Sequence, residues 1–264
     1  MILAGRRILL VHGLLGEVMA ALRPIGIDYM QGLAAWLCEA GAEASVVRLP
    51  TGEPVIRNAL ALRAAIAAEP RPPLVIAHSK GGLEALAALM DPRTVERCTG
   101  FIALQSPFFG SPIADVVTAS PALDATATSL ARLLRIGSGE GIRDLTTARR
   151  TAWMTTHAEA ITALVKHLPI LCVATTIPAR GAHGRDRAYA ITDAWMRGRG
   201  HGPSDGLVPL ASARIPGARS ITCEGSHIAC VSQGPGRDPV SILRDALCAL
   251  NAPRCAGAPF GSGH

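Results

Sequence analysis

Short aliphatic runs alternate along the chain with longer stretches in which apolar residues recur every three or four positions. Because consecutive strands joined by helices pair in parallel through right-handed crossovers, this alternation predicts an α/β fold. The central sheet should be mostly parallel, contain about six strands and carry helices on both faces, with ligands at the carboxyl ends of the strands. The runs are residues 8–11, 45–49, 74–77, 101–104, 170–174 and, more weakly, 219–223, and the helical stretches are 29–40, 55–68, 82–90 and 240–250.

One segment interrupts the alternation. Residues 115–168 contain no strand-like run, only helical stretches at 130–136 and 158–165, separated by Gly-Ser-Gly-Glu-Gly at 137–141. We interpret 115–168 as a helical cap or lid within a single domain spanning residues 1–264, and a pair of ordinary crossover helices is the alternative. A second stretch, 178–203, is rich in arginine and has a proline at each end, which predicts an exposed loop.

Length and composition narrow the possible classes of protein. A chain of 264 residues that is 49% hydrophobic can build one sizeable core. It has no apolar run of the length that a transmembrane helix needs. The apolar run near the N-terminus is short and leads into His-Gly instead of a cleavage site, so we expect a core strand and a cytoplasmic protein.

Charge and cysteine content exclude further classes. The net charge is +6, but the basic residues are scattered and only 3% of residues are aromatic, so no nucleic-acid partner is expected. The seven cysteines contain no Cys-x-x-Cys pair, so neither a zinc site nor a disulfide framework is indicated. Cys223 and Cys230 flank a histidine, but a bridge between them is disfavoured in a reducing compartment.

Ser79 lies where an aliphatic run changes directly to helical spacing, in Ala-His-Ser-Lys-Gly at 77–81. A serine on a sharp strand-to-helix turn with small neighbours is typical of the nucleophile elbow, usually Gly-x-Ser-x-Gly. Here alanine replaces the first glycine, while Gly81 and Gly82 leave room for the helix to pack close to the turn. The alternative is that Ser79 only caps the helix.

A serine nucleophile needs a base and an acid that orients the base, each in a loop after a later strand. Asp205 follows the run at 170–174, and His227 comes just after the run at 219–223. The order Ser79, Asp205, His227 is the chain order of α/β-hydrolases. Asp193 is the main rival for the acid.

Two other histidines lie near strand ends. His12 is assigned to shaping its loop, and the side chain of His78 should point away from the site. The oxyanion hole needs two N–H donors, for which we assign the backbone N–H groups of Leu14 and Lys80. The Lys80 side chain then needs no chemical role.

Several segments resemble those of one known family at corresponding places along the chain. They are LVHGLLG, IDYMQGLAAWLCEAGAEASVVRL, AHSKGG, LQSPFFGSPIAD, SDGLVP and SHIACVSQ. The family is that of the bacterial lipases and esterases of the Pseudomonas and Burkholderia type, in the α/β-hydrolase superfamily. The resemblance implies an α/β-hydrolase fold, with Ser79 as nucleophile, His227 as base and Asp205 as acid. It also implies that the backbone N–H groups of Leu14 and Lys80 are the oxyanion donors. Between residues 116 and 200 no motif of the family can be aligned.

The chain departs from this family in three ways. The family is mostly secreted, whereas no signal peptide is recognised here. Many members bind calcium through a carboxylate two residues after the catalytic histidine, where this chain has Ala229, so we expect no metal although Gln233 matches. A lipase lid should present a strongly apolar helix, whereas residues 150–168 are only moderately apolar, which argues against long-chain triglycerides.

The sequence thus predicts a serine carboxylic ester hydrolase that acts through an acyl-enzyme on a small-molecule or lipid-like ester and needs no cofactor. An intracellular acyltransferase, thioesterase or polyester depolymerase with the same triad is the alternative. A catalytically inactive binding module of the same fold is a third hypothesis, disfavoured because every triad and oxyanion position is filled.

Overall fold

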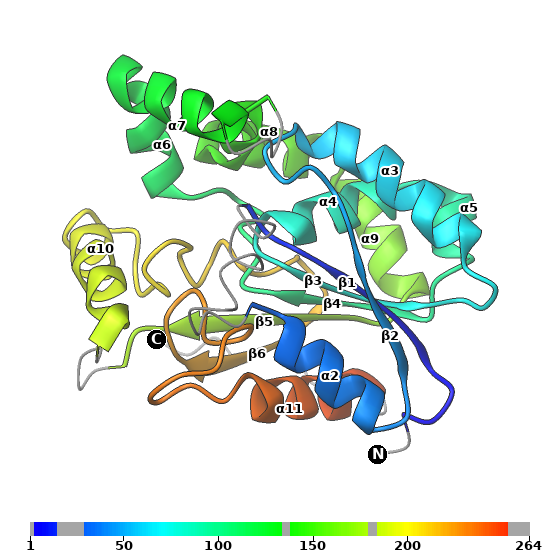
Figure 1. Cartoon of the computed structure of the whole chain (residues 1–264). Coiled ribbons are helices and arrows are strands. Elements are labelled where there is room, and N and C mark those ends of the chain that lie inside the picture. The colour runs from blue at the N-terminus through cyan, green and yellow to red at the C-terminus, as the bar shows by residue number, and fades with distance from the viewer. Residues whose placement is uncertain (1–2, 15–28, 134–137, 179–183, 253–264) are drawn as a thin grey trace.

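The computed structural model describes residues 3–14, 29–133, 138–178 and 184–252. One six-stranded sheet has the order β2-β1-β3-β4-β5-β6, and every neighbouring pair is parallel (Figure 1). The strands are β1 (Arg7–Val11), β2 (Glu43–Val47), β3 (Leu74–His78), β4 (Gly100–Leu104), β5 (Ile170–Thr176) and β6 (Arg219–Glu224). The predicted α/β fold with a parallel sheet is confirmed, and each predicted run corresponds to one strand.

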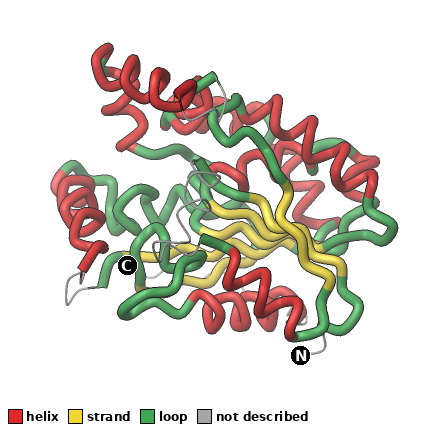
Figure 2. The backbone as a smooth tube through the Cα atoms, in the orientation of Figure 1, coloured by secondary structure: helices red, strands yellow, loops and turns green. Residues whose placement is uncertain are grey.

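Helices cover both faces of the sheet (Figure 2). They are α2 (Gln31–Glu39), α3 (Val55–Ala68), α4 (Lys80–Ala88), α5 (Pro92–Val95), α6 (Pro112–Ala119), α7 (Pro121–Leu133), α8 (Thr147–Thr156), α9 (Ala158–His167), α10 (Arg187–Gly198) and α11 (Pro239–Asn251), with short 3₁₀ turns η2 (Glu140–Leu145) and η3 (Gly184–Asp186). The four predicted helical stretches correspond to α2, α3, α4 and α11. No described helix combines the length and apolar character needed to cross a bilayer.

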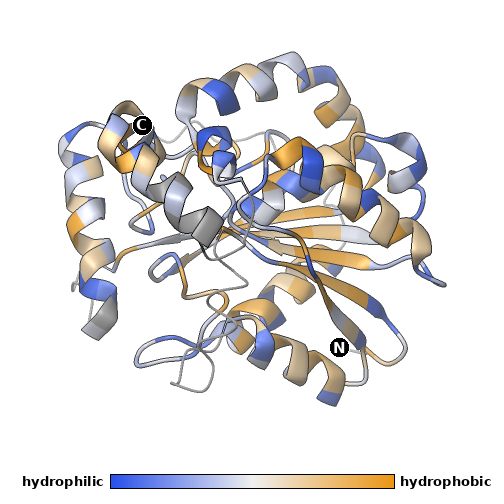
Figure 3. Cartoon of the chain, turned by 45° about the horizontal axis from the view of Figure 1, so that its top comes forward, coloured by the Kyte–Doolittle hydropathy of each residue, from blue (hydrophilic) through white to orange (hydrophobic). Residues whose placement is uncertain are grey.

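Two apolar cores lie on opposite faces of the sheet. In β1, Leu9 and Val11 belong to the core that also contains residues of α3, α4 and α9, whereas Ile8 and Leu10 belong to the core that contains residues of α2 and α11. Because successive side chains of a strand point to opposite faces, a strand covered on both sides must be apolar throughout. Much of the sheet is accordingly coloured as hydrophobic in Figure 3, and β3 and β4 are buried along their whole length.

The described part of 115–168 consists of helices and loops, as expected. Of these, α9 belongs to the body of the domain, because Ile161, Leu164 and Val165 are buried in the core on the α3 side of the sheet. Helices α6, α7 and α8 instead gather at one end of the molecule (Figure 1). Their role as a cap or lid stays a prediction.

The prediction of an exposed loop at 178–203 is wrong, because α10 occupies Arg187–Gly198. The inward face of this helix consists of Tyr189, Thr192, Asp193 and Met196, at helical spacing but mostly polar. Hydrophobic periodicity therefore gave no signal, while the exposed positions include Ile191. Residues 179–183 of the predicted loop lie outside the described residues.

Candidate active site

Ser79 lies at the sharp turn between β3 and α4, at the carboxyl end of a central strand. Its backbone has φ 53° and ψ −126°, a conformation that costs free energy for a residue with a side chain. A Cβ at Gly81 would overlap the carbonyl oxygen of His12, and one at Gly82 would overlap the side chain of Ser106. The expectation that both glycines let α4 pack close is confirmed. The Ser79 hydroxyl makes no capping bond to α4, which argues against a capping role.

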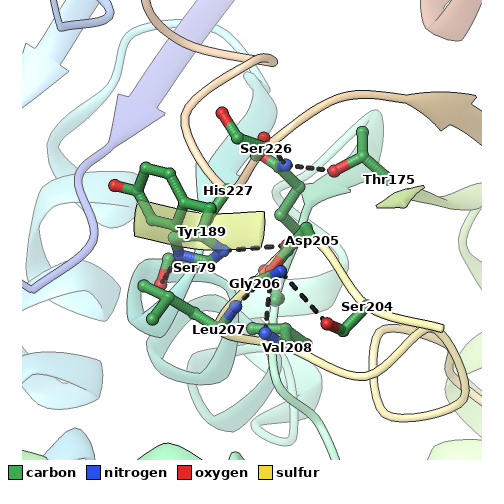
Figure 4. A network of polar contacts seen from close by, with 12 residues as sticks. Ser79, Thr175, Tyr189, Ser204, Asp205, Gly206, Leu207, Val208, Ser226 and His227 are labelled. Atoms are coloured by element: carbon green, nitrogen blue, oxygen red, sulfur yellow. Dashed lines mark hydrogen bonds and ion pairs between the residues drawn. The ribbon is translucent and has the colours of Figure 1, made fainter. Parts of the chain in front are cut away.

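Three separated residues form one hydrogen-bonded chain (Figure 4). The distance from Asp205 Oδ2 to His227 Nδ1 is 2.9 Å, and that from His227 Nε2 to Ser79 Oγ is also 2.9 Å. Because a carboxylate accepts hydrogen bonds, Nδ1 carries the imidazole proton and Nε2 faces the serine hydroxyl with its lone pair. The other oxygen of Asp205 accepts from the N–H groups of Leu207 (2.9 Å) and Val208 (2.8 Å), which fixes the carboxylate.

The backbone around His227 is held from several directions. Its N–H donates to the Asp205 carbonyl at 2.9 Å, so the loops that carry Asp205 and His227 are joined by main chain as well as by side chains. The buried Gln105 side chain donates to the Ser226 carbonyl at 2.8 Å and also contacts Thr175 of β5. The backbone of His227 is thereby held at the carboxyl end of the sheet independently of the contacts of its side chain.

Asp193, the rival acid, contacts neither His227 nor Ser79. It is 5% exposed and accepts from the Ser204 N–H (2.9 Å) and hydroxyl (2.7 Å). It also pairs with Arg197 at 2.7 Å. Asp193 thus anchors α10 to the residue before Asp205, a role that the sequence did not reveal because α10 was not predicted.

The loop after β1 lies against the serine turn. A Cβ at Gly13 would be only 2.8 Å from the Cβ of Ser79, so glycine permits this approach. Leu14 follows directly and lines the same cleft as Ser79. Lys80 is the first residue of α4, where an N–H has no intrahelical acceptor. Neither N–H donates to any residue that the structure describes, and their assignment as oxyanion donors stays a prediction.

The side chain of Lys80 enters the core. It forms an ion pair with Glu84, and both side chains are 1% exposed. The Asn58 amide donates to Glu84 Oε1 at 2.8 Å. Burial raises the pKa of Glu84, while Lys80 and Asn58 oppose this shift. The Lys80 side chain is therefore occupied in the core, and only its backbone faces the serine.

His78 does not point away from the site, contrary to the sequence prediction. Its Nδ1 lies 2.6 Å from the Tyr29 hydroxyl and its Nε2 lies 2.9 Å from the His227 carbonyl oxygen. Burial, and next the neighbouring His227, lowers the pKa of His78 to about 3. His12 stacks on Tyr29 with ring centroids 5.2 Å apart, and burial lowers its pKa to about 4. The sequence did not indicate that Tyr29 lies at this site.

Ser79 and His227 line an apolar cleft of about 260 Å³. One wall is α6, and the other walls come from the η2 turn and from the loops that follow Asp205 and His227. The apolar lining includes Ile113, Ala114, Val117, Ile142, Leu145, Leu207, Val208 and Ile228.

No cysteine within the described residues lines the cleft. Cys223 and Cys230 are both free thiols. Over the described ranges, no three His, Cys, Asp or Glu side chains converge in a way that would hold a metal ion.

Comparison with proteins of known structure identifies the fold. No protein-family model and no curated protein sequence matches the chain. Among solved structures, the mature Bacillus licheniformis lipase BlEst2 has a TM-score of 0.66 and 20% identity over 85% of this chain and 86% of the lipase. The metagenomic carboxyl esterase MGS0156 has a TM-score of 0.69 and 23% identity over 92% of this chain and 70% of the esterase. The Staphylococcus hyicus lipase has a TM-score of 0.65 and 13% identity over 92% of this chain and 94% of the lipase.

At such identities these matches show a shared α/β-hydrolase fold. The narrower resemblance to the Pseudomonas and Burkholderia type rests on the sequence motifs.

Proposed function

We propose that this protein is a serine hydrolase that cleaves carboxylic esters through a covalent acyl-enzyme. The observation that carries the proposal is the continuous hydrogen-bonded chain from Asp205 through His227 to Ser79, of which the last two line an apolar cleft. The three groups come from separate loops, yet each has the partner that this chemistry requires. A serine that only capped α4 would not need its hydroxyl to face the lone pair of an imidazole nitrogen.

The first half of the reaction forms the acyl-enzyme. Ser79 Oγ attacks the ester carbonyl carbon while His227 Nε2 takes the hydroxyl proton. Asp205 accepts from Nδ1 and stabilises the imidazolium that results. The tetrahedral intermediate then expels the alcohol, which leaves with the proton from Nε2. In the second half, water attacks the acyl carbon and gives a proton to Nε2. The second tetrahedral intermediate then expels Ser79 Oγ, which takes that proton back from Nε2 as the carboxylic acid is released.

The oxyanion formed in each half needs donors that are already in place. The backbone N–H of Lys80 is oriented by the start of α4, where the helix dipole is positive. The N–H of Leu14 lies in the loop that Gly13 allows against the serine turn. We propose these two groups as the oxyanion hole.

The cleft supports a preference for short acyl chains. Its volume of about 260 Å³ is below the roughly 300–1,000 Å³ of pockets that enclose drug-sized ligands. Its walls are mainly aliphatic, which suits a hydrocarbon chain and offers few partners for a polar acyl group. We therefore expect short p-nitrophenyl esters to be cleaved with higher kcat/KM than palmitate.

The experiment is labelling of the purified protein with a fluorophosphonate, followed by mass spectrometry of the modified peptide and by an ester panel of increasing chain length. Ser79 should be modified, and Ser79→Ala should lose at least about 10⁴-fold in kcat while remaining folded by circular dichroism. Ser220→Ala is the matched control, because Ser220 is an exposed serine on β6 outside the cleft. Undiminished turnover by Ser79→Ala would refute the proposal.

A thioester or a stored polyester could enter the same mechanism. Acyl-thioesters and polyester granules therefore belong in the panel beside the p-nitrophenyl esters. Higher kcat/KM on either would replace the simple ester as the substrate without changing the role of Ser79.

A further inference from the structure

We infer that Tyr29 and His78 form a buried hydrogen-bonded link that positions the proposed oxyanion loop relative to the catalytic histidine. The inference rests on the proposed function and adds two positioning residues to it. The link begins at Gly13, next to Leu14, and ends at the backbone of His227. It therefore connects the loop after β1 with the loop after β6.

The direction of every hydrogen bond in the link follows from its ends. The His227 carbonyl oxygen can only accept, so His78 Nε2, at 2.9 Å, must carry the proton. In a neutral imidazole the other nitrogen is then an acceptor, so the Tyr29 hydroxyl donates to Nδ1 at 2.6 Å. The Tyr29 oxygen in turn accepts from the Gly13 N–H at 3.1 Å.

This arrangement uses the one proton of the Tyr29 hydroxyl. Tyr29 lines the cleft, but it has no second proton to donate to an oxyanion, which leaves that task to backbone N–H groups. His78 is likewise occupied at both ring nitrogens. Neither residue is free for proton transfer with a substrate, so the link acts through the loops at its two ends.

Burial makes the link stiff. Tyr29 is 4% exposed and His78 is 2% exposed, so leaving one of their polar atoms without a partner is costly. In such surroundings hydrogen bonds strengthen one another, and an unpaired group is costly. The low pKa of His78 keeps the imidazole neutral, as the deduced tautomer requires. The geometry of the oxyanion loop is thus tied to that of the base.

Loosening the link should slow the chemical step more than it weakens binding. Tyr29→Phe keeps the ring and its packing but removes the bridging hydroxyl, leaving Gly13 N–H and His78 Nδ1 unpaired. We expect kcat and the rate of fluorophosphonate labelling to fall together by about 10-fold to 100-fold, with KM unchanged. His78→Gln can keep an N–H donor for the His227 carbonyl, but its amide oxygen cannot also occupy the position of the imidazole Nδ1, so the bond from the Tyr29 hydroxyl is lost.

The test is a double-mutant cycle of Tyr29→Phe and His78→Gln. Since both changes break the same link, the double variant should be no slower than the slower single variant. Ile161→Val, in α9 outside the cleft, is the control for lost stability without a change at the site. Additive losses in the cycle, or a Tyr29→Phe variant that loses stability with kcat and labelling rate intact, would overturn the inference.

A second measurement does not depend on ester turnover. Nitrogen-15 NMR of histidine-labelled protein should show His78 as the neutral Nε2–H tautomer, and Nδ1–H would overturn the link directly. If the wild-type protein neither labels nor cleaves any ester or thioester, the proposed function fails and the positioning role fails with it. The tautomer then still reports whether the link itself exists.

Discussion

Lys80 and Glu84 place two opposite charges in the core of the protein, where each side chain is only 1% exposed. Removing an ion from water costs several kcal/mol, and the attraction within the pair offsets this only while both charges are present. Asn58 gives Glu84 one further hydrogen bond, but Glu84 Oε2 has no partner among the described residues. Each charge is therefore stabilised mainly by the other. Removing one member of the pair should lower the free energy of unfolding far more than removing both.

The perturbation is a set of three variants. Glu84→Gln leaves the Lys80 ammonium buried without a counter-charge, and Lys80→Met leaves the Glu84 carboxyl without its partner. Each should lower the free energy of unfolding by about 3–5 kcal/mol. The combined Lys80→Met, Glu84→Leu variant fills similar space with apolar groups, and it should lie within about 1–2 kcal/mol of the wild type or be more stable.

The assay is urea denaturation followed by circular dichroism, with the midpoint and the slope fitted for each variant. Arg57→Gln is the matched control, because Arg57 pairs with Glu53 at the same sequence separation but its side chain is 73% exposed. It should cost less than about 1 kcal/mol. If Glu84→Gln costs no more than this control, or if the combined variant loses the sum of the two single losses, the reasoning is wrong.

Two further predictions concern acid stability and the loop that carries the acid. Burial holds the pKa of His78 near 3 in the folded protein, against 6.5 for an ordinary histidine. The unfolded chain therefore binds the proton first as the pH falls, so His78 alone should remove about 2 kcal/mol of stability between pH 7 and pH 5. His78→Gln should flatten the pH dependence of urea midpoints by that amount, and an unchanged slope would contradict this. Asp193→Ala should cost about 1–3 kcal/mol, because the buried Ser204 N–H loses its acceptor. Asp193→Ala should also lower kcat, because Asp205 is displaced. Asp193→Asn keeps an acceptor for Ser204 and should retain most of the stability and most of the kcat. An Asp193→Ala variant as stable and active as the wild type would contradict the proposed anchoring of α10 by Asp193.

The sequence was sufficient to predict the sheet and the residues now found together at its carboxyl edge. Strands covered on both faces must be apolar throughout, and this makes runs such as 74–77 and 101–104 visible without any tertiary information. Ser79, Asp205 and His227 could be proposed because loops after parallel strands converge at one edge. Their meeting within hydrogen-bond distance follows from topology as much as from local sequence.

What remained hidden depends on contacts between side chains that are distant in the sequence. The inward face of α10 is polar because Asp193 and Thr192 bind the loop around Asp205, so no apolar period marks that helix. The link through Tyr29 and His78 requires two side chains that are 49 positions apart to meet at 2.6 Å. Neither residue type nor spacing along the chain indicates such a contact.

The position of β6 has a consequence for the order in which activity and secondary structure are lost on heating. β6 is one of the two edge strands, and alternate residues along it reach solvent. The loops that carry Asp205 and His227 lie on either side of it in the sequence. Ser79, by contrast, follows β3 in the middle of the sheet. Edge elements open locally at lower free energy than central ones. Fraying of this edge would separate His227 from Ser79 while most of the secondary structure persists, so the proposed ester turnover should be lost before the circular dichroism signal on heating.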